Sequence, residues 1–239
     1  MATILGPDIP TDNLSLFIDI TNTNSYPSGS TTLYDLSPSR ITFSSGGTLM
    51  PLDLIDGVRC LNFNNSGYWT SDGGTSKSDL VDMGGDCTLV MWIYYENITE
   101  RDTIFEKAGT SYNSYQQEIA VTWETSERFS YYSRYSDYDY ASITSQKTGE
   151  WRQAALKMST GRTVTARTGF LSIEGGAWSS NYTSRSDTAL VSAGDIKIGT
   201  GYAGVVETGS LGIVACYNKM LSDSEIAQFY SETALRFGK

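Results

Sequence analysis

The 239-residue chain has no histidine. This absence excludes a Ser-His-Asp or Cys-His nucleophile, a histidine-ligated zinc ion and an imidazole that titrates near neutral pH. Any catalysis would therefore depend on carboxylates, lysine or tyrosine.

Basic residues are also scarce, with 17 Lys and Arg against 27 Asp and Glu and a formal net charge of −10. Nucleic acids and anionic membranes are bound through clustered basic side chains, so we expect neither as a partner. No apolar run approaches the ~18 residues of a membrane span, and the start MATILGPDIPTDN lacks the basic and apolar parts of a signal peptide. We therefore expect cytoplasmic synthesis without a signal peptide and no membrane insertion.

The chain has only three cysteines, Cys60, Cys87 and Cys216. They are odd in number and far apart, and each lies in an apolar, strand-like run. This pattern favours buried free thiols made in a reducing compartment over a disulfide.

Short apolar or alternating segments, separated by turn residues, fill most of the chain. Leu14–Ile20 alternates, residues 48–55 and 58–63 flank an Asp56-Gly57 turn, and Cys87–Tyr95 is apolar throughout, as in a central strand. About a dozen such segments predict an all-β, antiparallel two-sheet sandwich. We expect one domain over residues 14–239, preceded over residues 1–13 by an extended, proline-bearing arm.

The stretch Gly209–Gly238 predicts a buried strand, a turn and the only helix. Ser222 and Glu225 have the spacing of a capping box, and Ile226, Phe229 and Tyr230 share one helical face. We expect this last strand to pair near the first strand, with the helix packed against their junction.

Several segments resemble a known family. The strand EWRQAAL at residues 150–156 resembles the W-x-x-V-A strand of laminin-G/pentraxin-like members of the concanavalin A-like lectin/glucanase superfamily. Leu171–Gly176, Ile196–Gly199 and Gly209–Tyr230 are similar to the strands and ending that follow it there, although Ser210–Val214 lacks the acidic pair of that ending. The resemblance implies a concanavalin A-like jelly roll.

The N-terminal segments of the chain resemble a particular group within this superfamily. Leu14–Asp19, Ser25–Ser30 and Tyr34–Ser37, together with the ending Arg236-Phe237-Gly238, resemble structural proteins of tailed phages. This implies a non-enzymatic virion protein, such as a capsid decoration, head-fibre or tail-associated protein, made in the host cytoplasm. Its implied partners are the major capsid protein or another virion protein and further copies of itself. We expect the arm over residues 1–13 to contact a neighbouring subunit or a capsid protein.

Glycanases of this superfamily carry acidic residues at alternate positions of one strand, because nucleophile and general acid must face the same cleft. The nearest pattern here is Glu100–Glu106. Its last acid lies beyond that spacing, and the segment spans a loop and the start of a strand. We therefore expect no enzymatic activity and no catalytic residue.

The segment Phe129–Tyr140, FSYYSRYSDYDY, is rich in tyrosine. Rigid tyrosine rings interspersed with Ser, Asp and Arg resemble the composition of antibody contact loops, and sugars stack on such rings. Tyrosine is also simply common in half-buried strands. Either role fits the composition. The candidate ligand-binding residues are Tyr131, Tyr132, Arg134, Tyr135, Tyr138 and Tyr140, and the alternative function is a carbohydrate-binding, lectin-like module.

Calcium is the one cofactor to consider, since several relatives bind one through carboxylates and carbonyls at the sandwich rim. Asp19 and Asp35 are the candidate ligands by position. Solvated acids without a ligand role are the competing interpretation.

Overall fold

The computed structural model describes residues 8–63, 67–72, 80–82, 85–96, 102–108, 117–124, 128–134, 138–143, 148–160, 167–174, 176, 178–180, 194–201, 204–205 and 208–239. For β10, β11, β14 and β17 it describes the backbone path alone.

One sheet has eight strands, in the order β14-β13-β12-β7-β18-β5-β4 with β1 also paired to β18. Its strands are β1 (Leu14–Asp19), β4 (Leu52–Ile55), β5 (Val58–Phe63), β7 (Cys87–Tyr94), β12 (Trp151–Thr160), β13 (Arg167–Ile173), β14 (Ser179–Ser180) and β18 (Gly209–Tyr217). We call it the first sheet. As predicted, β7 is central, and the last strand pairs with the first.

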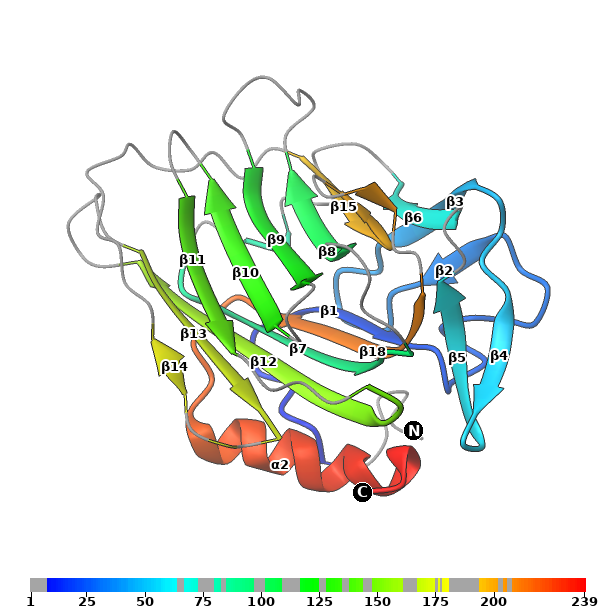
Figure 1. Ribbon diagram of the computed structural model, residues 1–239. Helices are drawn as coiled ribbons and strands as arrows, with labels where there is room; N and C mark the ends of the chain where they lie inside the picture. Colours follow the sequence, from blue (N-terminus) through cyan, green and yellow to red (C-terminus); the bar gives the residue numbers. More distant parts are fainter. Residues whose placement is uncertain are drawn as a thin grey trace.

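The second sheet also has eight strands, in the order β11-β10-β9-β8-β15-β6-β3-β2. Its strands are β2 (Thr32–Tyr34), β3 (Thr42–Gly47), β6 (Gly67–Ser71), β8 (Asp102–Ala108), β9 (Gln117–Glu124), β10 (Arg128–Arg134), β11 (Tyr138–Ile143) and β15 (Asp195–Ile198). A small ladder joins β16 (Thr200–Gly201) to β17 (Gly204–Val205). The pairings in both sheets are antiparallel, which confirms the predicted two-sheet sandwich (Figure 1).

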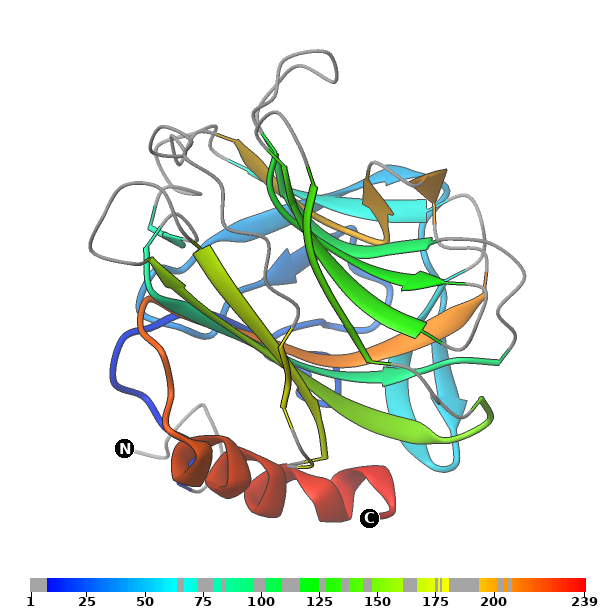
Figure 2. The same cartoon turned by 60° about the vertical axis from the view of Figure 1, so that its left-hand side comes forward.

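The molecule has three layers: the second sheet, the first sheet, and the C-terminal helix α2 (Asp223–Ala234) with its short extension η1 (Leu235–Phe237) (Figures 1 and 2). Alternate residues of β18 serve two cores. Leu211, Val214 and Cys216 belong to the core cluster between the sheets. Ile213, Ala215 and Tyr217 belong to a second cluster with residues of α2 and η1. A strand covered on both faces needs apolar residues at every position, which explains its sequence.

The β4–β5 connection is the predicted tight hairpin. Asp56 and Gly57 have φ values of 54° and 79°. Positive φ at both central residues is the geometry of a type I′ turn, for which Asp-Gly is a preferred pair.

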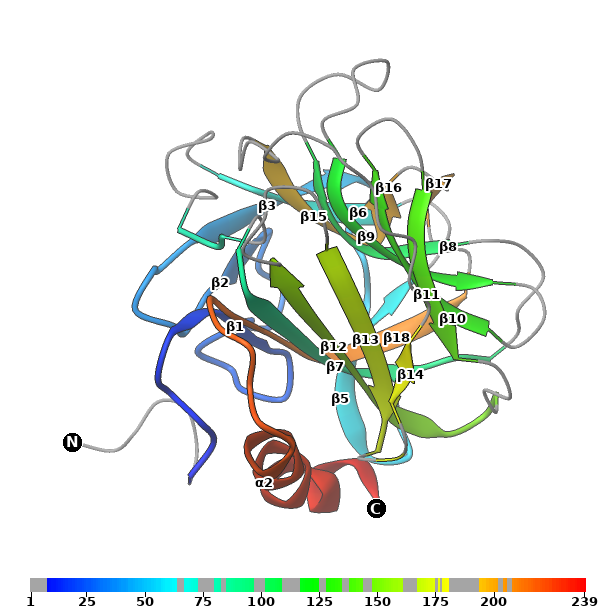
Figure 3. The same cartoon turned by 90° about the vertical axis from the view of Figure 1, so that its left-hand side faces the viewer.

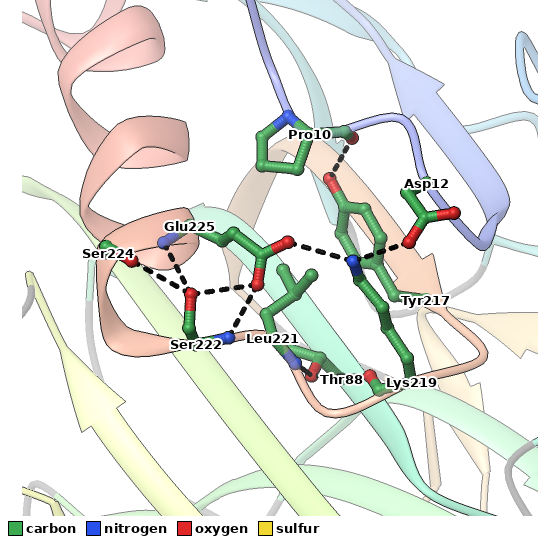
Figure 4. Close-up of polar contacts among 9 residues, drawn as sticks. All are labelled: Pro10, Asp12, Thr88, Tyr217, Lys219, Leu221, Ser222, Ser224 and Glu225. Atoms are coloured by element: carbon green, nitrogen blue, oxygen red, sulfur yellow. Dashed lines mark hydrogen bonds and ion pairs between the residues drawn. The ribbon is translucent and has the colours of Figure 1, made fainter.

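Helix α2 begins with the predicted capping box. Ser222 Oγ accepts from Glu225 N at 3.2 Å, and Glu225 Oε2 accepts from Ser222 N at 2.7 Å (Figure 4). Ile226 and Phe229 are buried, and Tyr230 stacks on Trp92 with ring centroids 5.6 Å apart. The helix therefore packs where the sequence places it.

Residues 8–13 differ from the expected arm, because they pack on their own chain. Ile9 is only 6% exposed and joins the second core cluster. The buried Tyr217 hydroxyl donates to the Pro10 carbonyl at 3.0 Å, and Lys219 Nζ donates to Asp12 Oδ2 at 2.9 Å (Figure 4). The prolines and polar residues of this segment favoured an extended arm, so the sequence gave no indication of these contacts. A contact between residues 1–7 and a neighbouring subunit lies outside the described residues.

All three cysteines are buried and none forms a disulfide, as predicted. Burial raises the pKa of the Cys60 thiol to about 11 and that of Cys216 well above its ordinary value. Trp69, Trp92 and Trp151 are likewise buried. Among the described residues, none of the helices has the length and apolarity needed to cross a membrane.

Candidate functional site

The tyrosine-rich segment forms the hairpin β10–β11, and β11 is the edge strand of the second sheet. In this ladder Tyr132 lies opposite Tyr140, and Arg134 lies opposite Tyr138. The strands are joined through residues 135–137, which lie outside the described residues, so the candidate Tyr135 does too. The sequence predicted two edge strands here. However, β10 also pairs with β9 and is therefore internal.

The register divides the candidate positions between the two faces of the sheet. Position 131 lies opposite Val121, which is fully buried in the core between the sheets. Directly opposed residues share a face and neighbours along a strand alternate. Position 131 therefore belongs to the core-facing side. Positions 132, 134, 138 and 140 belong to the outer side, so the register retains four of the candidate positions on one surface.

A single cross-strand row runs over this outer face. From the hairpin inward it passes through positions Tyr140, Tyr132, Ala120, Glu106, Lys197 and Thr70. The pairing thus sets two tyrosine positions and the carboxylate-bearing strand β8 on the same surface, separated by the small Ala120.

Glu106, the acid considered for catalysis, is 3% exposed. A register shift places Ile104 in the core between the sheets. The neighbouring positions on the face of Glu106 are therefore Thr103 and Ala108, so β8 supplies no second carboxylate for that face. Most glycoside hydrolases use two carboxyl groups across the scissile bond. The described part of β8 holds one.

Asp35, one predicted calcium ligand, is buried and bonded to the protein. Its Oδ1 accepts from the Phe17 and Ser37 amides, both at 2.8 Å. Its Oδ2 accepts from Ser37 Oγ at 2.7 Å and from the Ile41 amide at 3.1 Å. Burial raises the pKa of Asp35, and these four bonds act in the opposite direction. The carboxylate therefore fixes the turn at residues 35–41 to β1.

Asp19, the other predicted ligand, is 2% exposed and similarly bonded. Its Oδ1 accepts from Thr21 Oγ1 at 2.6 Å, and its Oδ2 accepts from Arg236 Nη1 at 2.9 Å. Among the described residues, no group of three or more His, Cys, Asp or Glu is placed to hold a metal ion. The two acids do not share such a group, and calcium binding stays a prediction.

Sequence reasoning missed the buried position of Lys107. It is fully buried and donates from Nζ to the Val81 carbonyl at 2.6 Å. The register of Phe105 against the core residue Val121 places position 107, two residues on, near the same side. Only the strand register reveals this, because a lysine in a strand otherwise indicates a solvent-facing position.

No protein-family model and no curated protein sequence matches this chain. Solved structures do match in fold. The receptor-binding domain of a botulinum neurotoxin C/D mosaic serotype has a TM-score of 0.69 at 12% identity, over 96% of this chain and 55% of that one. The binding domain of botulinum neurotoxin DC, solved in complex with SialylT, has a TM-score of 0.66 at 11% identity, over 92% and 52%.

Trypanosoma rangeli sialidase also shares the fold, with a TM-score of 0.65 at 12% identity. The match covers 97% of this chain and 34% of the sialidase. The chain thus spans about a third to a half of the length of these structures. At such identities the comparisons show a shared β-sandwich fold, and they include both an enzyme and receptor-binding domains.

Proposed function

We propose that this chain is a carbohydrate-binding domain without enzymatic activity, and that its glycan lies on the outer face of the second sheet at β10–β11. The observation that carries the proposal is the register of Tyr132 opposite Tyr140 on that face, at the edge of the sheet. Aromatic rings offer flat apolar surfaces for sugar rings, and the opposed Arg134 and Tyr138 positions add hydrogen-bonding groups. The fold shared with a toxin binding domain solved with SialylT supports a glycan ligand.

The non-enzymatic part of the proposal is supported by the single carboxylate position on the outer face of β8. Most retaining and inverting glycosidases use a pair of acids. Incubating the protein with any glycan that it binds should therefore give no hydrolysis. Hydrolysis that disappears in Glu106→Gln would contradict this part of the proposal while leaving binding intact.

A glycan array on the purified chain, followed by calorimetry with the best ligand, tests binding. The double variant Tyr132→Ala/Tyr140→Ala should lose binding by about tenfold or more, since aromatic contacts contribute about 1 kcal/mol each. Tyr132→Phe/Tyr140→Phe keeps the rings and should retain most of the affinity. Leu54→Ala, at a 70% exposed residue of the first sheet, is the control. No glycan bound, or full binding by the double alanine variant with an unchanged melting curve, would refute the site.

A second proposal, a structural role in a phage virion, is supported by the sequence resemblance. The segments that carry it meet in the fold: Asp19 of the opening bonds to Arg236 of the ending, and Ser25 Oγ accepts from Asp19 N at 3.1 Å and donates to Tyr34 O at 2.8 Å. If the proposal is correct, the protein co-purifies with particles at a copy number tied to capsid or tail symmetry, bound to a capsid or other virion protein. Recovery only as a free host protein would contradict it.

A further inference from the structure

A hollow lies at the opposite edge of the second sheet from the tyrosine-rich hairpin. Its volume is about 410 Å³, and it is lined by Asn24, Tyr34, Asp35, Leu36, Arg40, Ile41 and Thr42. Strand β2 forms this edge and β11 forms the other, and Figures 1 and 3 show them far apart. Pockets for small ligands have volumes of about 300–1,000 Å³, so one sugar unit fits this hollow.

The rim of the hollow is fixed by hydrogen bonds. Tyr34 and Thr42 lie opposite each other at the end of the β2–β3 ladder. The Asp35 amide donates to the Ile41 carbonyl at 2.9 Å, and the Asp35 carboxylate receives the four bonds described above. Arg40 lies inside this turn with φ of 51°, a left-handed conformation uncommon for a long side chain. The turn therefore fixes the backbone position from which the Arg40 side chain extends.

Arg40 differs from the other described arginines in its side-chain partners. The structure describes the side chains of four arginines. Arg59 bonds to the carbonyls of Ile20 and Tyr26, Arg152 pairs with Glu150 and Glu174, and Arg236 pairs with Asp19. Within the described residues the exposed Arg40 guanidinium makes no hydrogen bond or ion pair. In a chain of net charge −10, an unpaired cation in the lining of a hollow indicates an anionic ligand group.

The other lining groups add the features of a sugar site. Tyr34 is 41% exposed and offers a ring face. Asn24 is exposed, and its side-chain amide can donate to and accept from hydroxyl groups. Asp35 is the opposing charge in the lining, and its carboxylate is compensated by its four donors.

We propose that this hollow binds a monosaccharide unit that carries a carboxylate, with the Arg40 guanidinium paired to the carboxylate and Tyr34 against the sugar ring. A planar guanidinium donates two parallel hydrogen bonds to a carboxylate, which a neutral sugar cannot accept in the same way. The site is separate from the hairpin and does not depend on it.

Amide NMR titration of the full chain with glucuronate, N-acetylneuraminate and glucose tests the proposal. Both acids should shift the amide signals of residues 34 and 40–42, with dissociation constants at least about tenfold below that of glucose, because charge-assisted bidentate bonds are the stronger kind. Arg40→Gln should reduce acid binding to the glucose level, and Arg40→Lys should give an intermediate value. Arg101→Gln, which removes the same charge at the residue before β8 in the sequence, should bind as the parent does.

Three outcomes would refute the proposal that the hollow binds an acidic sugar. These are equal binding of glucose and both acids, unchanged acid binding by Arg40→Gln, or no shift of these signals at the highest soluble ligand concentration. The titration is repeated in the Tyr132→Ala/Tyr140→Ala background. Acid binding that persists in this double variant occurs at the hollow, whereas binding that the double variant loses occurs at the hairpin. Each of the two proposed sites can therefore be refuted without refuting the other.

Discussion

The indole of Trp92 and the ring of Phe237 stack nearly in parallel, with centroids 4.4 Å apart and planes 6° apart. The Trp92 Nε1 also donates to Thr233 Oγ1 at 2.8 Å. A Cβ on Gly212 would lie 2.4 Å from Phe237, so only glycine admits the ring this close to β18. These contacts hold η1 and the end of α2 against the first sheet.

Phe237→Ala should lower the free energy of unfolding by about 3–5 kcal/mol, because it removes a buried ring and leaves a cavity beside Trp92. The matched control is Leu235→Ala. Leu235 is 87% exposed and lies two residues away, so this change should stay within about 0.5 kcal/mol. Urea unfolding of both variants measures the difference. Equal stability of the two would contradict the packing described here.

Residues 8–13 should contribute to stability. Ile9→Ala should cost about 2 kcal/mol through lost burial, and Tyr217→Phe about 1 kcal/mol through the lost bond to Pro10. Asp12→Ala removes only an ion pair whose carboxylate is largely exposed, and should cost less than about 1 kcal/mol. Thermal melts of the three variants test this order. An unchanged melt for Ile9→Ala would restore the free arm that the sequence predicts.

Glu225 should make stability depend on pH in the acid range. The hydrogen bonds from Lys219 and then from the Ser222 amide lower the pKa of Glu225 from 4.5 to about 2. A lowered folded pKa gives stabilisation that is complete above pH 4.5 and is lost as the pH falls towards 2. Glu225→Gln should be less stable at pH 7, and its stability should fall less between pH 4.5 and 2.

Glu232→Gln, a change of the same kind on α2, is the control for this profile. Urea midpoints measured across the acid range should fall with decreasing pH as steeply in Glu232→Gln as in the parent protein. An equally steep fall in Glu225→Gln would show that the carboxylate of Glu225 does not act as described.

Metal removal tests the calcium expectation. Because the oxygens of Asp19 and Asp35 accept bonds from protein donors, EDTA or added calcium should change the melting temperature by less than about 1 °C. Asp35→Asn should lower stability by about 2 kcal/mol or more, since its amide nitrogen cannot accept from the donors at Oδ2. A clear rise of the melting temperature with calcium, absent in Asp35→Asn, would instead identify a calcium site.

The strands, the β4–β5 turn and the capping box could be predicted because local rules determine them. An Asp-Gly pair between apolar runs and a serine three residues before a glutamate each indicate one geometry. The packing of residues 8–13 could not be predicted, since it depends on partners at the far end of the chain, Tyr217 for Pro10 and Lys219 for Asp12. The division of the tyrosines between two faces also needed the register with Val121. The hollow at Arg40 escaped prediction because its lining comes from three separated segments around one buried aspartate.

The layer order places the described ends of the chain and the second sheet on opposite sides of the first sheet. Asp8 and Lys239 both lie beside α2, through the bonds of Gln228 to the Asp8 carbonyl and of the Lys239 amide to Ala234. The second sheet lies on the other face of the first (Figure 2). A bead, a fluorophore or a carrier protein attached at Lys239 would thus lie on the α2 side of the molecule. It would leave both proposed sugar sites accessible to a glycan-coated surface.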